Sequence, residues 1–167
     1  MSVVCARVYE DKIVMAADSI MCRGDLMRTS GDIVKLRTVN GMGIGSVGLA
    51  QEINLMYRYA DTHLPSSPTE IGVQDFIVEF SKWKHTYDGD YEVNNNYLIA
   101  YKGHLFCVEG FLVYEVKEYE SIGAGLQYGL AALYLGHSPK EAVKVSCDLC
   151  CYVAEPIVEM TYSKEVN

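Results

Sequence analysis

The sequence has few basic residues for its length. Its 167 residues include 14 lysines and arginines against 22 aspartates and glutamates, so the formal net charge at pH 7 is −8. Nucleic acids attract proteins through a basic surface, and this balance therefore argues against a nucleic-acid partner. The sequence also lacks long apolar runs. None approaches the roughly 20 residues that span a bilayer, so we expect no membrane partner.

The first residues lack the pattern of a secretory signal peptide. Such a peptide has a basic stretch followed by an uninterrupted apolar segment. Four charged residues interrupt this segment, namely Arg7, Glu10, Asp11 and Lys12. We therefore expect a cytoplasmic protein whose six cysteines stay reduced. We interpret the cysteines as small buried hydrophobic residues.

Residues that commonly bind metals are present without the usual spacing. Cys147 and Cys150 stand beside Cys151, but no second pair of cysteines or histidines follows at zinc-ligand spacing. The run Asp88-x-Asp90-x-Glu92 lacks the length and the glycine of a calcium loop. We predict neither a metal nor a cofactor.

Strand patterns come in blocks. We predict strands over residues 2–9, 12–18, 33–39, 42–47, 96–101, 104–109, 112–119 and 157–162. The first two flank the turn-like Glu10-Asp11, and the next two flank Asn40-Gly41, a strong hairpin dipeptide. Four strands are thus predicted before any helix.

Helical patterns come in pairs. We predict helices over residues 49–64, 67–84, 126–135 and 138–152. Two of them begin with Ser-Pro-x-Glu, at Ser67 and Ser138, which places a serine N-cap, a proline at N1 and a glutamate at N3 of a capping box. Strands in blocks and helices in pairs predict an α+β protein in which two packed sheets are covered by helices, as one domain over residues 1–167.

The segment GIGSVGLAQE contains G-x-G-x-x-G at Gly43, Gly45 and Gly48. A dinucleotide site needs a second strand soon after this loop and an acidic residue that ends it. Here the predicted helix continues past Asp61, so the acidic residue is on a helix. We interpret the glycines as residues that permit close strand-to-helix packing. A nucleotide-binding module stays a third-ranked hypothesis.

Asp18 and Lys35 are candidate functional residues because both are charged and both lie in apolar strand patterns. Asp18 ends the strand in VMAADS, and Lys35 lies inside IVKLR. A buried ammonium is costly unless a carboxylate pairs with it. Two interpretations stay open: a buried Asp–Lys pair, and a surface lysine on a half-exposed strand.

Several segments, taken in order, resemble the proteasome β-subunit superfamily, and especially its HslV-type and Anbu-type members. They are MSVV at the start, VMAADS, Lys35, GIGSVGLA, SIGAGLQYGLAAL and the helix that begins at Ser138. The likeness covers nearly the whole chain. It implies a four-layer α-β-β-α sandwich of the N-terminal nucleophile hydrolase type. It also implies a polypeptide substrate, a homo-oligomeric ring or double ring, and an ATP-dependent unfoldase as partner.

The resemblance further implies a catalytic mechanism. Aligning VMAAD with the family's strand places Ser2 on the nucleophile, exposed by removal of Met1, with its own α-amine as general base. Lys35 matches the family's catalytic lysine, which Asp18 would hold in place. The backbone N–H of Val47 would face the tetrahedral oxyanion.

The resemblance also implies the residues that would bind substrate. Cys22 and Leu49 would offer backbone hydrogen bonds to an extended peptide. Gly45 and Gly48 would leave room for the substrate beside the strand edge. One departure points elsewhere, because Ala124 stands where active members often carry a serine. The alternative function is therefore a catalytically silent shell or scaffold protein on the same fold.

Overall fold

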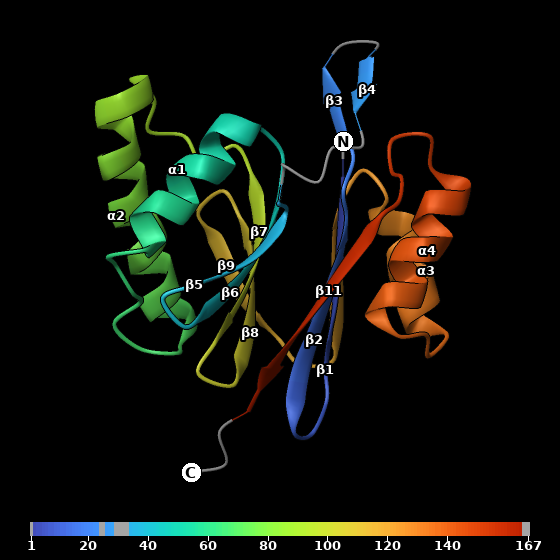
Figure 1. Cartoon of the computed structure of the whole chain (residues 1–167). Coiled ribbons are helices and arrows are strands. Elements are labelled where there is room, and N and C mark those ends of the chain that lie inside the picture. Colours follow the sequence, from blue (N-terminus) through green and yellow to red (C-terminus); the bar gives the residue numbers. More distant parts are fainter. Residues whose placement is uncertain (1, 24–25, 29–33, 165–167) are drawn as a thin grey trace.

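The computed structural model describes residues 2–23, 26–28 and 34–164. These residues form two antiparallel sheets packed face to face, with a pair of helices outside each sheet (Figure 1). The strands are β1 (Val3–Val8), β2 (Lys12–Asp18), β3 (Met21–Arg23), β4 (Leu26–Arg28), β5 (Leu36–Val39), β6 (Met42–Val47), β7 (Asn96–Tyr101), β8 (His104–Glu109), β9 (Leu112–Val116), β10 (Tyr119–Gly123) and β11 (Ile157–Ser163). The helices are α1 (Ala50–Ala60), α2 (Glu70–Asp88), α3 (Leu126–Tyr134) and α4 (Pro139–Leu149).

The layers follow the order α-β-β-α. Strands β10-β1-β2-β11 form one sheet, β5-β6-β7-β8-β9 form the other, and β3-β4 form a separate ribbon. In Figure 1, α1 and α2 cover the five-stranded sheet, and α3 and α4 cover the four-stranded sheet. The predicted four-layer α+β fold is therefore confirmed. No helix within the described residues has the length and apolarity needed to cross a bilayer.

The first hairpins form as predicted, and an additional ribbon follows them. Val8 pairs with Ile13 and Val39 with Met42, so the turns lie where the sequence places them. Strands β3 and β4 were not predicted, because three-residue strands are too short for an alternating pattern. Among the described residues, six strands rather than four therefore precede α1. Lys35 lies just before β5 rather than inside it, and residue 33, where this strand was predicted to begin, lies outside the described residues.

The predicted strand over residues 112–119 is wrong in its extent. The segment contains all of β9, at the edge of one sheet, and the first residue of β10, at the edge of the other. The chain crosses between the sheets at Lys117 and Glu118, where the Glu118 carbonyl accepts a hydrogen bond from the Val8 N–H at 2.7 Å. This crossing brings Gly123 beside Val3 in the four-stranded sheet.

Helices α1, α2 and α4 end at other residues than predicted, and α2 also begins at another residue. Helix α1 ends at Ala60 rather than residue 64, and α4 ends at Leu149 rather than residue 152. Helix α2 runs on to Asp88, where Gly89 takes the left-handed conformation that ends it. Its N-cap is Thr69, whose hydroxyl accepts from the Gly72 N–H, and not the predicted Ser67. The capping box at Ser138 is confirmed.

The two Ser-Pro-x-Glu segments provide a matched stability test. Ser138→Ala removes the hydroxyl that caps the Glu141 N–H, so we expect a loss of about 1 kcal/mol in the free energy of unfolding. Ser67→Ala should cost only a few tenths of that, about 0.3 kcal/mol, because Ser67 caps no helix. Urea denaturation of both variants checks the difference. Equal losses would contradict the assignment of the caps.

Gly43 and Gly45 are needed because the two sheets approach closely at β6. A Cβ on Gly43 would lie 2.2 Å from the Tyr162 ring, and one on Gly45 would lie 2.7 Å from Val4 Cγ1. The interpretation of these glycines as packing residues is supported, but the contact is between the sheets rather than between a strand and a helix.

Burial of the cysteines is only partly as predicted. Cys5 and Cys107 are buried, and this burial raises the pKa of each thiol to about 12. Cys147 and Cys150 are half-buried and Cys151 is exposed, so the prediction is wrong for these three. The five cysteines whose side chains the structure describes are free.

Candidate active site

Asp18 and Lys35 form a buried ion pair at the end of β2. Lys35 Nζ donates to both carboxylate oxygens of Asp18, each at 2.8 Å. Asp18 is 1% exposed and Lys35 is 4% exposed. The Lys35 carbonyl accepts a hydrogen bond from the Ser46 N–H at 2.7 Å, which ties this segment to β6. Of the two interpretations left open by the sequence, the buried pair is the one observed.

The same carboxylate holds the start of β1. The Val3 N–H donates to Asp18 Oδ1 at 2.8 Å, and the Ile20 N–H donates to Oδ2 at 3.3 Å. Oδ1 is therefore shared between the Lys35 ammonium and the amide that directly follows Ser2. Ser2 is itself buried, at 4% exposed. The ion pair and the N-terminal segment consequently form one cluster.

Tyr57 supports the segment that leads to Lys35. Its hydroxyl donates to the Val34 carbonyl at 3.0 Å and accepts from Ser46 Oγ at 3.4 Å. Burial raises the pKa of Tyr57 to about 12, so the hydroxyl keeps its proton and acts as a donor. The residue before Lys35 is thereby fixed to α1.

The end of β6 lies close to Ser2. A Cβ added to Gly123 would lie 2.3 Å from the Ser2 carbonyl oxygen and 3.1 Å from Val47 Cγ1. Gly123 therefore lies between Ser2 and Val47, where a side chain on residue 123 would not fit. The Gly125 N–H donates to the Ser2 carbonyl at 3.3 Å, so the residues after β10 also hold Ser2.

The backbone direction along β6 argues against Val47 as the oxyanion donor. The Ser46 N–H points toward the β5 side, because it donates to the Lys35 carbonyl. Successive N–H groups along a strand point to opposite sides. The Val47 N–H therefore points toward β7, where Val47 lies opposite Asn96. The Val47 N–H is therefore directed into the sheet, and the predicted role of oxyanion donor does not fit it.

The next amide, that of Gly48, points to the Lys35 side. Across a planar trans peptide the N–H of Gly48 is opposite in direction to the carbonyl of Val47, which faces β7. Gly48 is exposed, and in the described part of the chain no hydrogen bond engages its N–H. This amide is the better candidate for an oxyanion donor. Strand alternation could have selected it from the sequence, but only with the partner of Ser46 known.

The other predicted substrate-binding residues are placed less favourably. Both backbone groups of Leu49 are bound by the Asn95 side chain, so they are not available to a peptide. Gly45 is buried against Val4 and Met15 between the sheets. Cys22 lies in β3, and its side chain is outside the described residues. Gly48 and Leu49 are both exposed just after β6, but the Leu49 backbone is already bound, so Gly48 is the better placed of the two.

Comparison with solved structures identifies the fold. BPH from Thiobacillus denitrificans matches with a TM-score of 0.86 at 17% identity, covering 99% of this chain and 100% of that chain, and a second BPH structure is in complex with epoxomicin. Eukaryotic HslV from Trypanosoma brucei matches with a TM-score of 0.71 at 18% identity, covering 95% and 98%. Anbu (ancestral beta-subunit) from Yersinia bercovieri matches with a TM-score of 0.72 at 18% identity, covering 98% and 82%. The chain has the proteasome β-subunit-like fold.

The proteasome β-subunit-like fold extends over nearly all of this chain and of the BPH and HslV chains. No family model matches the sequence, and no curated protein sequence matches it either. At 17 to 18% identity the likeness establishes the fold.

Proposed function

We propose that this protein is a peptidase whose nucleophile is the hydroxyl of Ser2 after removal of Met1. The observation that carries the proposal is the shared carboxylate of Asp18, which binds the Lys35 ammonium and the amide after Ser2. The carboxylate thus holds an ammonium near the N-terminal segment, where a hydroxyl residue can be activated by its own α-amine. The fold supports the same conclusion.

The reaction proceeds through an ester on Ser2. The neutral α-amine of Ser2 takes the proton of Oγ, and Oγ attacks the substrate carbonyl carbon. The tetrahedral oxyanion accepts a hydrogen bond from the Gly48 N–H. The C–N bond then breaks, and the leaving amine takes the proton from the α-ammonium. Water, deprotonated by the same amine, hydrolyses the ester and restores Ser2.

Lys35 lowers the activation free energy of this reaction electrostatically. Its positive charge favours the developing alkoxide of Ser2, and it disfavours protonation of the α-amine, so the amine stays a competent base near neutral pH. Asp18 fixes the ammonium with two hydrogen bonds of 2.8 Å. Because both charges are buried, their interaction is only weakly screened by salt.

The proteasome β-subunit-like fold supports an expectation for the substrate and for the assembly. We expect a polypeptide substrate, bound in extended form beside the end of β6. We expect copies of the chain to assemble into a homo-oligomeric ring or double ring in the cytoplasm, supplied by an ATP-dependent unfoldase.

A catalytically silent shell protein is the second candidate, and Ala124 favours it. Ala124 directly precedes Gly125, whose N–H binds the Ser2 carbonyl, so a hydroxyl at position 124 would lie near the N-terminal residue. Alanine provides none. A shell protein needs no free serine and would tolerate this loss.

Intact mass and peptide cleavage, measured on one preparation, separate the two candidates. The peptidase should lack the mass of Met1 and should cleave a fluorogenic peptide. The shell protein should retain Met1 or should show no cleavage after its loss. A preparation that is fully trimmed and inactive toward a varied peptide library would contradict the peptidase assignment.

A further inference from the structure

The side chain of Asn95 holds the backbone that follows Val47. Its Oδ1 accepts from the Leu49 N–H at 2.6 Å, and its Nδ2 donates to the Leu49 carbonyl at 2.9 Å. The carboxamide therefore pairs with Leu49 as a neighbouring strand would. Asn95 is 0% exposed, so water does not compete for these two bonds.

Gly48 is shaped to fit this clamp. Its φ of +126° is a backbone conformation that residues with side chains rarely adopt. A Cβ at this position would lie 2.0 Å from Asn95 Oδ1 and 3.2 Å from Asn95 Cα. The carboxamide thus lies directly against the Gly48 Cα. Contact with Asn95 therefore limits where the Gly48 backbone can lie.

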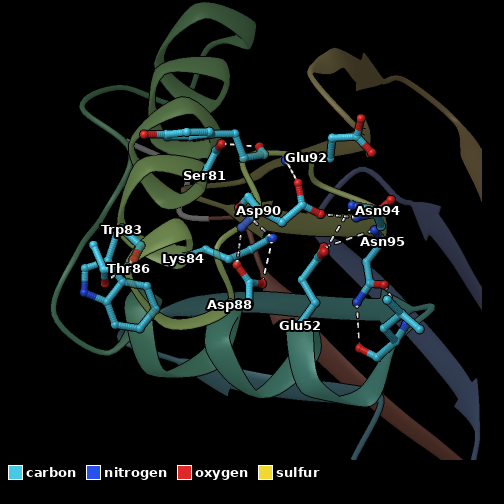
Figure 2. Close-up of polar contacts among 12 residues, drawn as sticks. Glu52, Ser81, Trp83, Lys84, Thr86, Asp88, Asp90, Glu92, Asn94 and Asn95 are labelled. Carbon is cyan, nitrogen blue, oxygen red and sulfur yellow. Dashed lines mark hydrogen bonds and ion pairs between the residues drawn. The ribbon is translucent and has the colours of Figure 1, made fainter.

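Glu52 holds Asn95 in turn. Glu52 is 3% exposed, and its Oε1 accepts from the Asn95 N–H at 3.0 Å and from the Tyr97 hydroxyl at 2.9 Å. Its Oε2 accepts from the Asn94 N–H at 3.1 Å. Burial and the neighbouring Glu52 charge raise the pKa of Tyr97, which keeps this donor protonated. Figure 2 shows Glu52 reaching from α1 to Asn94 and Asn95.

We infer that Asn95 is a positioning residue that sets the direction of the Gly48 N–H, with Glu52 fixing Asn95. The inference rests on the proposed function, because it gives the Gly48 N–H an oxyanion to bind. A donor that is already fixed before the reaction needs no reorganisation when the oxyanion forms. A displacement of about 1 Å in such a group can cost a hundredfold in rate.

The test compares neighbouring asparagines. Asn95→Ala removes both bonds to Leu49, whereas Asn94→Ala removes only an exposed side-chain bond to Asp90. We expect Asn95→Ala to lower kcat for a fluorogenic peptide by about 10- to 100-fold, with KM changed less than about threefold. Asn94→Ala should leave both constants unchanged. Equal kinetics for the two variants would overturn the inference.

Two further measurements guard against a loss of fold and against failure of the proposed function. Asn95→Asp keeps the shape and the acceptor, but it replaces the donor with a carboxylate oxygen that faces the Leu49 carbonyl, so its kcat should fall at least as far as that of Asn95→Ala. Amide hydrogen exchange of Leu49 should be faster in Asn95→Ala and unchanged in Asn94→Ala. If the wild type cleaves no peptide, the proposed function fails, and unchanged Leu49 exchange in Asn95→Ala then overturns the clamp as well.

Discussion

Ser2→Ala is expected to abolish peptide cleavage, with a loss of about 10⁴-fold or more in kcat, because it removes the atom that forms the ester. Binding of a peptide should change little, since the alanine side chain differs only by the hydroxyl oxygen. The free energy of unfolding should fall by about 1 kcal/mol at most, because Ser2 is buried and loses only its hydroxyl. Fluorogenic peptide turnover and a thermal unfolding curve for each protein provide the measurements.

Ser2→Thr is the matched control for this variant. Threonine keeps the hydroxyl and adds a methyl group that restricts the rotamers of Oγ. We expect this variant to retain turnover within about tenfold of the wild type, and Met1 removal must be checked in both variants by mass. Full activity in Ser2→Ala would contradict the assignment of the nucleophile, whatever the activity of Ser2→Thr.

Lys35→Met is expected to cost both activity and stability. Asp18 would be left as a buried carboxylate without a cation, a situation that typically costs about 3–5 kcal/mol in the free energy of unfolding. The variant also loses the charge that favours the Ser2 alkoxide, so we expect kcat to fall by at least about 10²-fold. Urea denaturation and peptide turnover measure the two effects separately.

Two variants separate the structural effect from the catalytic one. The double variant Lys35→Met with Asp18→Asn removes both buried charges, so it should recover much of the lost stability while staying inactive. Lys82→Ala breaks an exposed ion pair with Glu79 and should cost less than about 1 kcal/mol. Restored turnover in the double variant would show that Lys35 acts on stability alone.

The sequence predicts the architecture because hairpins and amphipathic helices leave local signals. Asn40-Gly41 fixes one turn, and Ser138 fixes the start of α4, so both were placed correctly. The short strands β3 and β4 have no such signal. At Lys117 and Glu118 the chain passes from one sheet to the other, although its sequence pattern stays that of a strand. The sequence could not predict this crossing, because a strand pattern does not indicate which sheet the strand joins.

The candidate site depends on contacts between segments that are distant in the sequence. The residue types of Asp18 and Lys35 suggested a pair, but its burial depends on the packing of both sheets. The choice between the Val47 and Gly48 amides depends on the partner of the Ser46 N–H, which is the Lys35 carbonyl. The clamp between Glu52 and Asn95 joins residues 43 positions apart, and no motif marks it.

The identity of the nucleophile can be measured most directly by trapping the ester. A brief reaction with an activated ester substrate, followed by an acid quench and peptide mapping by mass spectrometry, locates the acyl group. We predict one acyl group on the side chain of Ser2 in chains that lack Met1, and none in Ser2→Ala. An acyl group found instead on another residue, such as the exposed thiol of Cys151, or turnover by chains that retain Met1, would contradict the proposed mechanism.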